Sequence, residues 1–216
     1  MIKLPQMAVK NNNLFMREAM RCAVRALRHD DVPIGAVIVK NGVIIARGEN
    51  RVQKGRDPTA HAEMIAIRSA AKKLGQKFLD NCDIYVSLEP CAMCAAAISF
   101  ARIKRLVFAA DDPKGGGVNY GARVYETDPH LWKPAIEKDN DYSDTSSKML
   151  RDFFKKIRIK NIKKAAPAKT GTRPAAKPSK EVVRRAKTIK KSLKKKSRED
   201  KLKEKGRGGR GIAGAA

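Results

Sequence analysis

The sequence predicts an α/β fold in which helices pack on the faces of a mixed β-sheet. Two observations indicate this class. Segments with apolar residues at helical spacing alternate along the chain with short β-branched runs, which is typical of layered α/β domains. The dipeptide Asn41-Gly42 joins two of these runs, residues 34–40 and 43–47. It favours the type I′ turn of an antiparallel hairpin, because both turn positions need a positive φ.

The first predicted element, ahead of the hairpin, is an amphipathic helix over residues 13–28. Its apolar side chains recur at i, i+3 and i+4 spacing and are Leu14, Ala19, Cys22, Ala23, Ala26 and Leu27. After the hairpin, residues 48–57 are polar and contain glycine, which predicts a loop. A second helix is expected to begin at Asp57-Pro58-Thr59 and to stop at Gly75, because caps and Pro mark helix starts and Gly marks helix ends.

The remaining elements continue the alternation. A strand over residues 83–88 precedes a helix that Pro90 opens and that runs to about residue 101, and residues 105–110 form the next strand. Residues 111–142 are rich in Gly, Asp and Pro, so no element is assigned there. The last element is a helix from residue 143 to residue 160, with an apolar side formed by Met149, Leu150, Phe153, Phe154 and Ile157.

Charge divides the 216-residue chain into a domain over residues 1–160 and a tail over residues 161–216. The net charge is +26, of which +10 lies in the domain and +16 in the tail. The tail has no aromatic residue and few large apolar ones, so it cannot offset the entropy of ordering and we expect it to be disordered. The basic excess in the domain favours a polyanionic partner over the alternative, a solvated basic face.

Neither a membrane nor a disulfide framework is expected. No apolar run approaches the roughly 20 residues of a membrane span, and the N-terminus lacks the apolar segment of a secretory signal. An organelle transit peptide stays open. The chain has four cysteines, of which Cys22 and Cys82 are expected to be packed thiols. This cysteine usage in a large, Lys-rich chain indicates a reducing compartment, and we expect the cytoplasm.

Three residues form a candidate metal site: His61, Cys91 and Cys94. The two cysteines are three positions apart at a predicted helix start, so both thiols can reach one ion from the same face. The N-terminus of a helix also favours thiolates. His61 would supply an imidazole from another helix. Three protein ligands leave a fourth position for water, which is typical of catalytic zinc sites.

Glu63 lies two residues after His61, about 200° away on a helix. We therefore expect it to act as an acid and base on the metal-bound water instead of binding the ion. Zinc lowers the pKa of such a water to about 7. The alternative is a closed structural site with a fourth protein ligand, for which the candidates are Cys82, Cys22, His29 and His130. A strand of roughly 20 Å would separate Cys82 from the ion.

The pattern His-x-Glu with Pro-Cys-x-x-Cys is typical of zinc-dependent nucleobase deaminases, and the chain resembles the cytidine deaminase-like superfamily. Within it, residues 57–63 (Asp-Pro-Thr-Ala-His-Ala-Glu) and 88–94 (Leu-Glu-Pro-Cys-Ala-Met-Cys) closely resemble those of bacterial tRNA-specific adenosine deaminases. Other similar segments are residues 32–37, 48–51, 103–108 and 153–156. The likeness covers about residues 12–160, although residues 112–141 match poorly.

The resemblance implies a three-layer α-β-α fold with a mixed central sheet of about five strands and one Zn²⁺ per subunit. It also implies conversion of adenosine to inosine at the wobble position of tRNA anticodons. His61, Cys91 and Cys94 would bind zinc, and zinc-bound hydroxide would attack C6 of adenine. Glu63 would carry protons to N1 and to the leaving amine.

The resemblance implies further roles outside the metal site. Asn50 and the backbone N–H of Ala62 would hold the edge of the base, although Asn50 could also be a simple turn residue. Possible RNA contacts in the C-terminal helix are Arg151, Phe153, Phe154, Lys155 and Lys156. Core packing is the alternative for the two Phe side chains. The implied partners are a tRNA anticodon stem-loop and a second copy of the chain in a homodimer.

Two other functions are compatible with the motif. One is a zinc-dependent deaminase of a free base or nucleotide, of the guanine or deoxycytidylate type. The other is a basic RNA-binding protein without enzymatic activity, in which zinc only supports the fold. The basic excess of residues 1–160 favours an RNA substrate over a small molecule.

Overall fold

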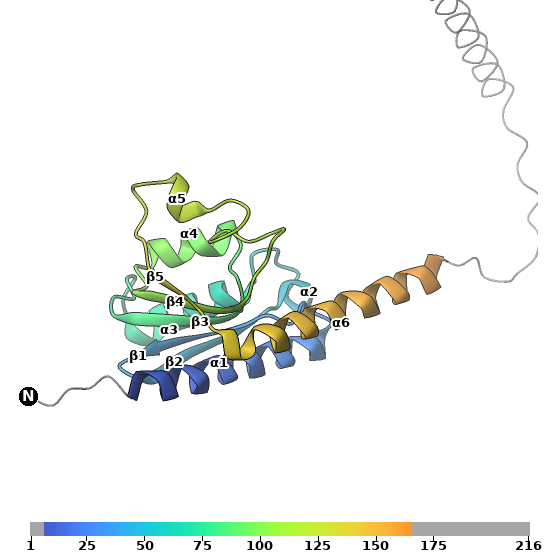
Figure 1. Ribbon diagram of the computed structural model, residues 1–216, viewed down its shortest axis with the longest axis horizontal. Coiled ribbons are helices and arrows are strands. Elements are labelled where there is room, and N and C mark those ends of the chain that lie inside the picture. The colour runs from blue at the N-terminus through green and yellow to red at the C-terminus, as the bar shows by residue number, and fades with distance from the viewer. Residues whose placement is uncertain (1–6, 166–216) are drawn as a thin grey trace, which may run out of the picture. The chain divides into compact units, whose positions relative to one another are not determined.

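The computed structural model describes residues 7–165, which lie in the compact unit Met1–Ala166 (Figure 1). Its centre is a five-stranded sheet with the order β2-β1-β3-β4-β5. The strands are β1 (Gly35–Lys40), β2 (Val43–Glu49), β3 (Cys82–Leu88), β4 (Arg105–Ala110) and β5 (Ala135–Lys138). Strand β1 is antiparallel to both β2 and β3, whereas β3, β4 and β5 are parallel. The predicted mixed sheet of about five strands is therefore confirmed.

Helices cover both faces of the sheet. Helices α1 (Met7–Ala26) and α6 (Asn140–Ala165) lie on one face, and α3 (Ala62–Leu74) lies on the other together with α4 (Ala92–Phe100) (Figure 1). The strands supply alternate residues to the two layers, as the pleat requires. Val37 packs with the α1 side chains and Ile38 with those of α3 and α4. The three-layer arrangement explains why the central strands are apolar on both faces.

The hairpin between β1 and β2 has the predicted turn. Asn41 has a φ of 51° and Gly42 a φ of 75°, which are the left-handed values of a type I′ turn. The helix predicted over residues 13–28 is also present, as α1 followed by the short 3₁₀ helix η1 (Leu27–His29). Strand β4 has the predicted bounds, and Gly75 ends α3 with a φ of 65°.

The predicted start of the second helix is wrong. Asp57 accepts hydrogen bonds from the backbone N–H and the hydroxyl of Thr59, at 2.8 and 2.7 Å, and so closes a local turn instead of capping a helix. Helix α3 begins at Ala62, with His61 in extended conformation as its N-cap. The ligand residue therefore stands just outside the helix, and the 200° rotation expected between His61 and Glu63 does not apply.

A short helix, α2 (Val52–Gly55), occupies the segment that was predicted to be a loop. The buried carboxylate of Asp31 accepts the N–H groups of Gln53 and Lys54, at 2.7 and 3.1 Å. These donors are otherwise unsatisfied in the first turn of a helix. Because the acceptor comes from a distant part of the sequence, no local pattern could indicate this helix.

The long segment after β4 contains two elements that were not assigned, α5 (Val124–Thr127) and β5. All four residues of β5 are exposed, so the strand lacks the alternation by which strands are recognised. Helix α6 is longer than predicted at both ends. Its predicted apolar side is only partly right, because Phe153 is buried while Phe154 and Ile157 are exposed.

Within residues 7–165, no helix combines the length and the apolar character that crossing a membrane requires. The tail predicted to be disordered lies, from residue 166 onward, outside the described residues.

Candidate metal centre

The structure brings the three predicted metal ligands together at the starts of two helices. His61 is the N-cap of α3, Cys91 is the N-cap of α4, and Cys94 lies in the first turn of α4. The Nδ1 atom of His61 is 3.6 Å from the Sγ atom of Cys91 and 3.5 Å from that of Cys94. All three ligand atoms lie within 4.8 Å of one another.

These distances fit a tetrahedral zinc ion. Zn–S bonds of about 2.3 Å and Zn–N bonds of about 2.0–2.1 Å place nitrogen and sulfur about 3.5–3.6 Å apart at the tetrahedral angle. Among the described residues, the group contains no fourth His, Cys or carboxylate ligand. The candidates for a closed site have other surroundings: His29 contacts Lys54, and Cys22 accepts a hydrogen bond from Arg25. Three ligands with an open position match a catalytic site better than a structural one.

The electrostatics of the ligand cluster favour a cation. A hydrogen bond with the Cys94 thiol, together with one to His61, lowers the pKa of Cys91 to about 4 despite burial. The hydrogen bond with Cys91 and burial raise the pKa of Cys94. The hydrogen bond with Cys91 also raises the pKa of His61, against the opposing effect of burial. The lowered pKa favours the thiolate form of Cys91, and a bound dication would favour the thiolate form of Cys94 as well.

Glu63 is a buried carboxyl group beside this cluster. It is 3% exposed in the first turn of α3, and its Oε2 atom has no hydrogen-bond partner within the described structure. Burial raises the pKa of Glu63 to about 7, and the negative charge of Cys91 adds to the rise. A carboxyl group with this pKa can both accept and release a proton near neutral pH. Its oxygens do not join the ligand group, and its acid–base role stays a prediction.

Asn50 is the second buried polar residue without a full set of partners. It is 3% exposed, and its Oδ1 atom has no hydrogen-bond partner in the described part of the chain. The backbone around it is fixed, because Asn50 donates its N–H to Ile34 at 3.0 Å and Arg51 donates to Ala60 at 2.9 Å. An unsatisfied buried amide costs roughly 1–3 kcal/mol. This points to a ligand more than to a simple turn residue.

Strand β2 and helix α3 approach each other closely next to Ala62. A Cβ atom on Gly48 would lie 2.0 Å from the carbonyl oxygen of Ala62, so only glycine fits at this position. Ala62 itself is fully buried. As the first residue of α3, it has an N–H group that cannot bond within the helix. This N–H is therefore suited to the base-holding role that was predicted for it.

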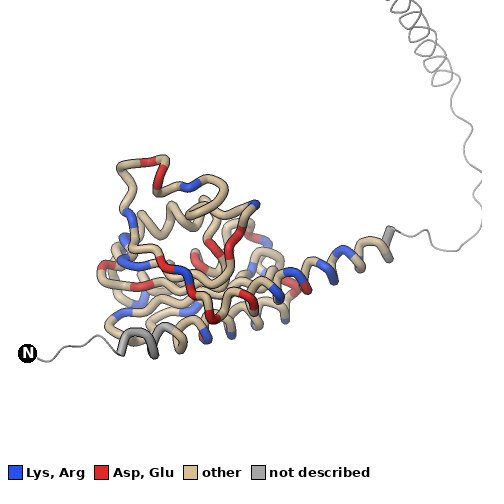
Figure 2. Tube along the Cα trace, viewed as in Figure 1, with Lys and Arg blue, Asp and Glu red and all other residues tan. Residues whose placement is uncertain are grey.

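The predicted RNA contacts lie on α6. Basic positions recur along this helix (Figure 2). Arg151, Lys155 and Lys156 are exposed, and within the described residues they form no ion pair. The two Phe rings contact each other edge to face at 5.4 Å. Phe153 is 8% exposed and belongs to the protein interior, whereas Phe154 is 45% exposed. Core packing therefore accounts for Phe153, and Phe154 is free to contact a partner.

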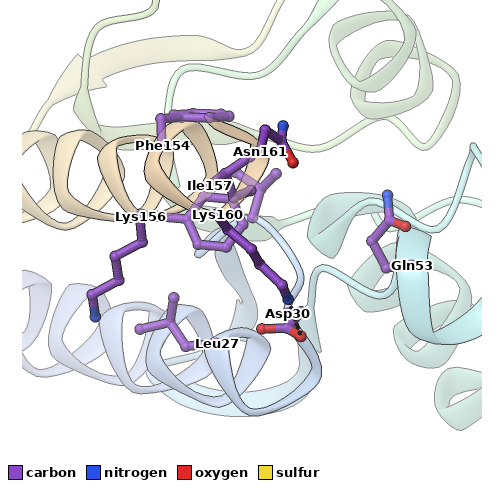
Figure 3. Close-up of a pocket in the computed structure, with 10 residues that line it drawn as sticks. Leu27, Asp30, Gln53, Phe154, Lys156, Ile157, Lys160 and Asn161 are labelled. Atoms are coloured by element: carbon purple, nitrogen blue, oxygen red, sulfur yellow. Dashed lines mark ion pairs between the residues drawn. The ribbon is translucent and has the colours of Figure 1, made fainter. Parts of the chain in front are cut away.

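Sequence reasoning missed a cavity beside α6. A pocket of about 620 Å³ lies between α6, η1 and α2 (Figure 3). Its walls combine apolar, amide and charged groups, including Leu27, Asp30, Gln53, Phe154, Lys156 and Lys160. Lys160 and Asp30 form an ion pair at 3.8 Å. Gln53, in α2, is three residues after Asn50 in the sequence. The pocket depends on α2, for which the sequence carried no local signal.

Comparison with known proteins agrees with this geometry. The family described as "Cytidine and deoxycytidylate deaminase zinc-binding region" matches residues 9–110. A tRNA-specific adenosine deaminase of Agrobacterium fabrum is 48% identical over 145 residues, which is 67% of this chain and 95% of the relative. One of Aquifex aeolicus is 42% identical over 144 residues, 67% of this chain and 94% of the relative.

A solved structure from work on A-to-I editing by tRNA:A34 deaminases at the wobble position is also similar. It has a TM-score of 0.62 and 46% sequence identity. The match covers 64% of this chain and 99% of the solved chain. The similar part therefore accounts for nearly the whole of these relatives.

Proposed function

The chain belongs to the tRNA-specific adenosine deaminase family, and we propose that it converts adenosine to inosine at the wobble position of tRNA anticodons by hydrolytic deamination. The observation that carries the proposal is the pairing of a three-ligand metal site with two unsatisfied buried groups. These groups are Asn50 Oδ1 and Glu63 Oε2. A structural zinc site would need neither group. A site that binds and protonates a base needs an amide that holds the base by hydrogen bonds and a carboxyl group that transfers the proton.

His61, Cys91 and Cys94 would hold the zinc ion of the family, and their spacing fits its tetrahedral geometry. When bound, the ion supplies Lewis-acid activation of water at neutral pH. Glu63 would take up a proton from the attacking water and deliver it to N1 of adenine. It would then take up the second proton, from the hydroxyl group added at C6, and deliver it to the departing amine, which leaves as ammonia. Its burial suits it to both steps, because its protonated and ionised forms are close in free energy at neutral pH.

Asn50 would orient the adenine ring. A carboxamide oxygen accepts a hydrogen bond from the exocyclic N6 amino group of adenine, and the amide N–H donates to N7. The Ala62 N–H, in the first turn of α3, would add a donor for the base. These contacts give the Oδ1 atom of Asn50 the partner that it lacks among residues 7–165.

Helix α6 would bind the RNA on either side of the target nucleotide. The exposed cations Arg151, Lys155 and Lys156 suit phosphates, and Phe154 offers a ring face for an unstacked base. The pocket next to Phe154 is large enough for a base, and Gln53 of α2 forms part of its wall. A single-stranded anticodon loop presents such bases without the opening of a duplex.

The proposal also includes a homodimer of this chain and its location in the cell. Phe100 at the end of α4 is 69% exposed on the helix that carries two metal ligands, and a second copy of the chain would cover it. A homodimer in which the neighbouring subunit completes the substrate site is the arrangement that the family resemblance implies. A tRNA substrate supports a cytoplasmic location.

The test compares substrates. Zinc-loaded protein is incubated with an anticodon stem-loop that carries adenosine at the wobble position and, separately, with free adenosine, cytidine, guanine and deoxycytidylate. We expect inosine in the stem-loop and no turnover of the small molecules. Turnover of a free base or nucleotide without inosine in the RNA would contradict the proposal and support the small-molecule alternative. Binding of RNA without any ammonia release would support a binding protein.

A further inference from the structure

Glu89 is a buried carboxylate next to the metal site to which neither the motif nor the proposed chemistry gives a role. It lies between the end of β3 and Pro90 and is 2% exposed. Among the described residues, no Lys, Arg or His forms an ion pair with it. A buried carboxylate without a cation is stable only if other donors satisfy its oxygens.

The donors are four backbone N–H groups, all from the loop that follows β4. The Oε1 atom of Glu89 accepts from Val118, Asn119 and Tyr120, at 3.2, 2.8 and 3.0 Å. The Oε2 atom accepts from Asp112 at 3.0 Å. We define the β4–α5 loop as residues 111–123. This loop therefore folds around one side chain, since without Glu89 these four N–H groups would lose their acceptor.

The same loop packs directly against the backbone of the ligand Cys91. Gly116 and Cys91 form an isolated antiparallel bridge, and Gly117 donates its N–H to Pro90 at 2.8 Å. The approach is too close for side chains. A Cβ atom on Gly117 would lie 2.5 Å from the nitrogen of Ala92, and one on Gly116 would lie 2.5 Å from Glu89 Oε1. Cys91 is thus held between the first turn of α4 and this loop.

We propose that Glu89 is a positioning residue of the metal centre: it organises the β4–α5 loop, and the loop fixes the backbone of Cys91 so that its thiolate faces the ion. The inference rests on the proposed zinc-dependent function, because it concerns a ligand of that centre. A carboxylate suits the role since it has acceptors only. The amide of a glutamine would direct an N–H group toward the N–H of Asp112 or toward those of Val118, Asn119 and Tyr120.

The experiment compares wild-type protein with Glu89→Gln, which keeps the size of the side chain. The control is Glu126→Gln, the same change at an exposed carboxylate on α5 whose only ion-pair partner in the described residues is Arg123, at 3.4 Å. Two quantities are measured. One is hydrogen exchange of the amides of residues 112–120, and the other is the rate at which zinc passes from the loaded protein to a chromogenic chelator.

We expect Glu89→Gln to accelerate both processes by about tenfold or more, which corresponds to roughly 1.4 kcal/mol or more of lost stabilisation. Exchange in α1, β1 and β2 should keep its wild-type rate, and Glu126→Gln should behave as wild type. Faster exchange spread evenly over the whole domain, with zinc release unchanged, would mean a merely structural role and would overturn the proposal. Unchanged exchange in residues 112–120 would overturn it as well.

A second variant covers the case in which Glu89→Gln does not fold. Gly116→Ala leaves the carboxylate in place and pushes the loop away from it. We expect the same faster loop exchange and faster zinc release. When Glu89→Gln and Gly116→Ala are combined, their effects on zinc release should not add, because both changes remove the contact between Glu89 and the β4–α5 loop. Gly116→Ala with wild-type zinc release would refute the proposal. These readouts need neither RNA nor turnover, so their failure is distinct from failure of the deaminase assay.

Discussion

At the scale of single residues, chemistry is concentrated in a few buried polar groups. Glu63 and Asn50 are almost fully buried, and each has an oxygen without a partner among the described residues. Such groups reduce the stability of the folded chain by roughly 1–3 kcal/mol each. The fold tolerates them because the surrounding helices and strands are well packed. The two unsatisfied atoms are therefore the physical basis on which we propose that a substrate binds here.

Glu63→Gln tests the acid–base role. The amide keeps the shape of the side chain but cannot accept and release a proton, so we expect the rate of inosine formation to fall by at least about 10²–10⁴-fold. Zinc content and affinity for the stem-loop should stay close to wild type, because Glu63 is outside the ligand group. Single-turnover kinetics measures the rate, metal analysis measures the zinc content, and a binding titration measures the affinity for the stem-loop. A variant that keeps zinc and turns over within tenfold of wild type would contradict the role.

The ligand residues could be predicted from the sequence because their chemistry is local. His61, Cys91 and Cys94 are recognisable by type and spacing, and the structure brings all three together. Glu89 could not be found in this way. Its role depends on N–H groups of residues 112–120, which lie in a segment without any recognisable pattern. A buried carboxylate that binds backbone groups leaves no signature in residue spacing.

At the scale of elements, the metal site depends on how closely β2 approaches α3. Gly48 is the contact point, and its replacement by a larger residue would displace the carbonyl of Ala62 and the ligand His61 beside it. The elements with clear periodicity, such as α1 and β4, were predicted well. The start of α3 was not, because Asp57 closes a local turn with Thr59 instead of capping the helix. Helix α2 and strand β5 were not, because a distant side chain and a neighbouring strand determine them.

Gly48→Ala should therefore disturb the metal site, although Gly48 is not one of its ligands. The new Cβ atom would lie 2.0 Å from Ala62 O, and overpacking of this kind typically costs about 1–3 kcal/mol or more. We expect a lower melting temperature and loss of bound zinc. Gly55→Ala is the matched control, because its nearest neighbouring atom would be 4.0 Å away. Equal zinc content in the two variants would show that the approach of β2 does not position His61.

The contact between α1 and β2 makes stability depend on pH. Glu49 accepts hydrogen bonds from Arg25 at 3.0 Å and from Arg51 at 3.2 Å. Burial alone would raise the pKa of Glu49, but the Arg25 hydrogen bond and the Arg51 charge outweigh it and lower the pKa. The unfolded chain then binds the proton more tightly. The stabilising effect is complete above an unfolded pKa of about 4.3 and is lost as the pH falls through the lower folded value.

Glu49→Gln should remove this dependence. We expect it to lower the free energy of unfolding by about 1–3 kcal/mol at pH 7 and to differ less from wild type as the pH falls below about 4. Urea unfolding at several pH values measures both quantities. A difference between wild type and variant that stays constant from pH 7 to pH 3 would show that the ion pairs do not lower the pKa.

At the scale of the whole molecule, the excess of positive charge suits the proposed RNA partner. Residues 1–160 carry +10 and residues 161–216 carry +16. Within the described part, the cations of α6 extend along the helix past the sheet (Figure 2). The fold class could be predicted because alternating helical and strand patterns restrict a chain to few layered solutions. The pocket beside α6 could not, since three separate elements meet there.

The basic C-terminal residues should add nonspecific affinity for RNA. Deletion of residues 166–216 is expected to reduce the slope of log affinity against log salt concentration, because fewer counterions are released on binding. The rate of the chemical step at saturating RNA should not change, since the metal centre lies within residues 61–94. Binding titrations at several salt concentrations measure the slope. An identical slope for both proteins would mean that this segment does not contact the RNA.

X-ray absorption at the zinc edge tests the central claim most directly. We predict one zinc ion per chain, bound by two sulfur atoms at about 2.3 Å and one imidazole nitrogen at about 2.0–2.1 Å, with one further light atom from solvent. That result would match an open catalytic centre formed by His61, Cys91 and Cys94. A third sulfur, a second imidazole or a zinc content far below one per chain would contradict it.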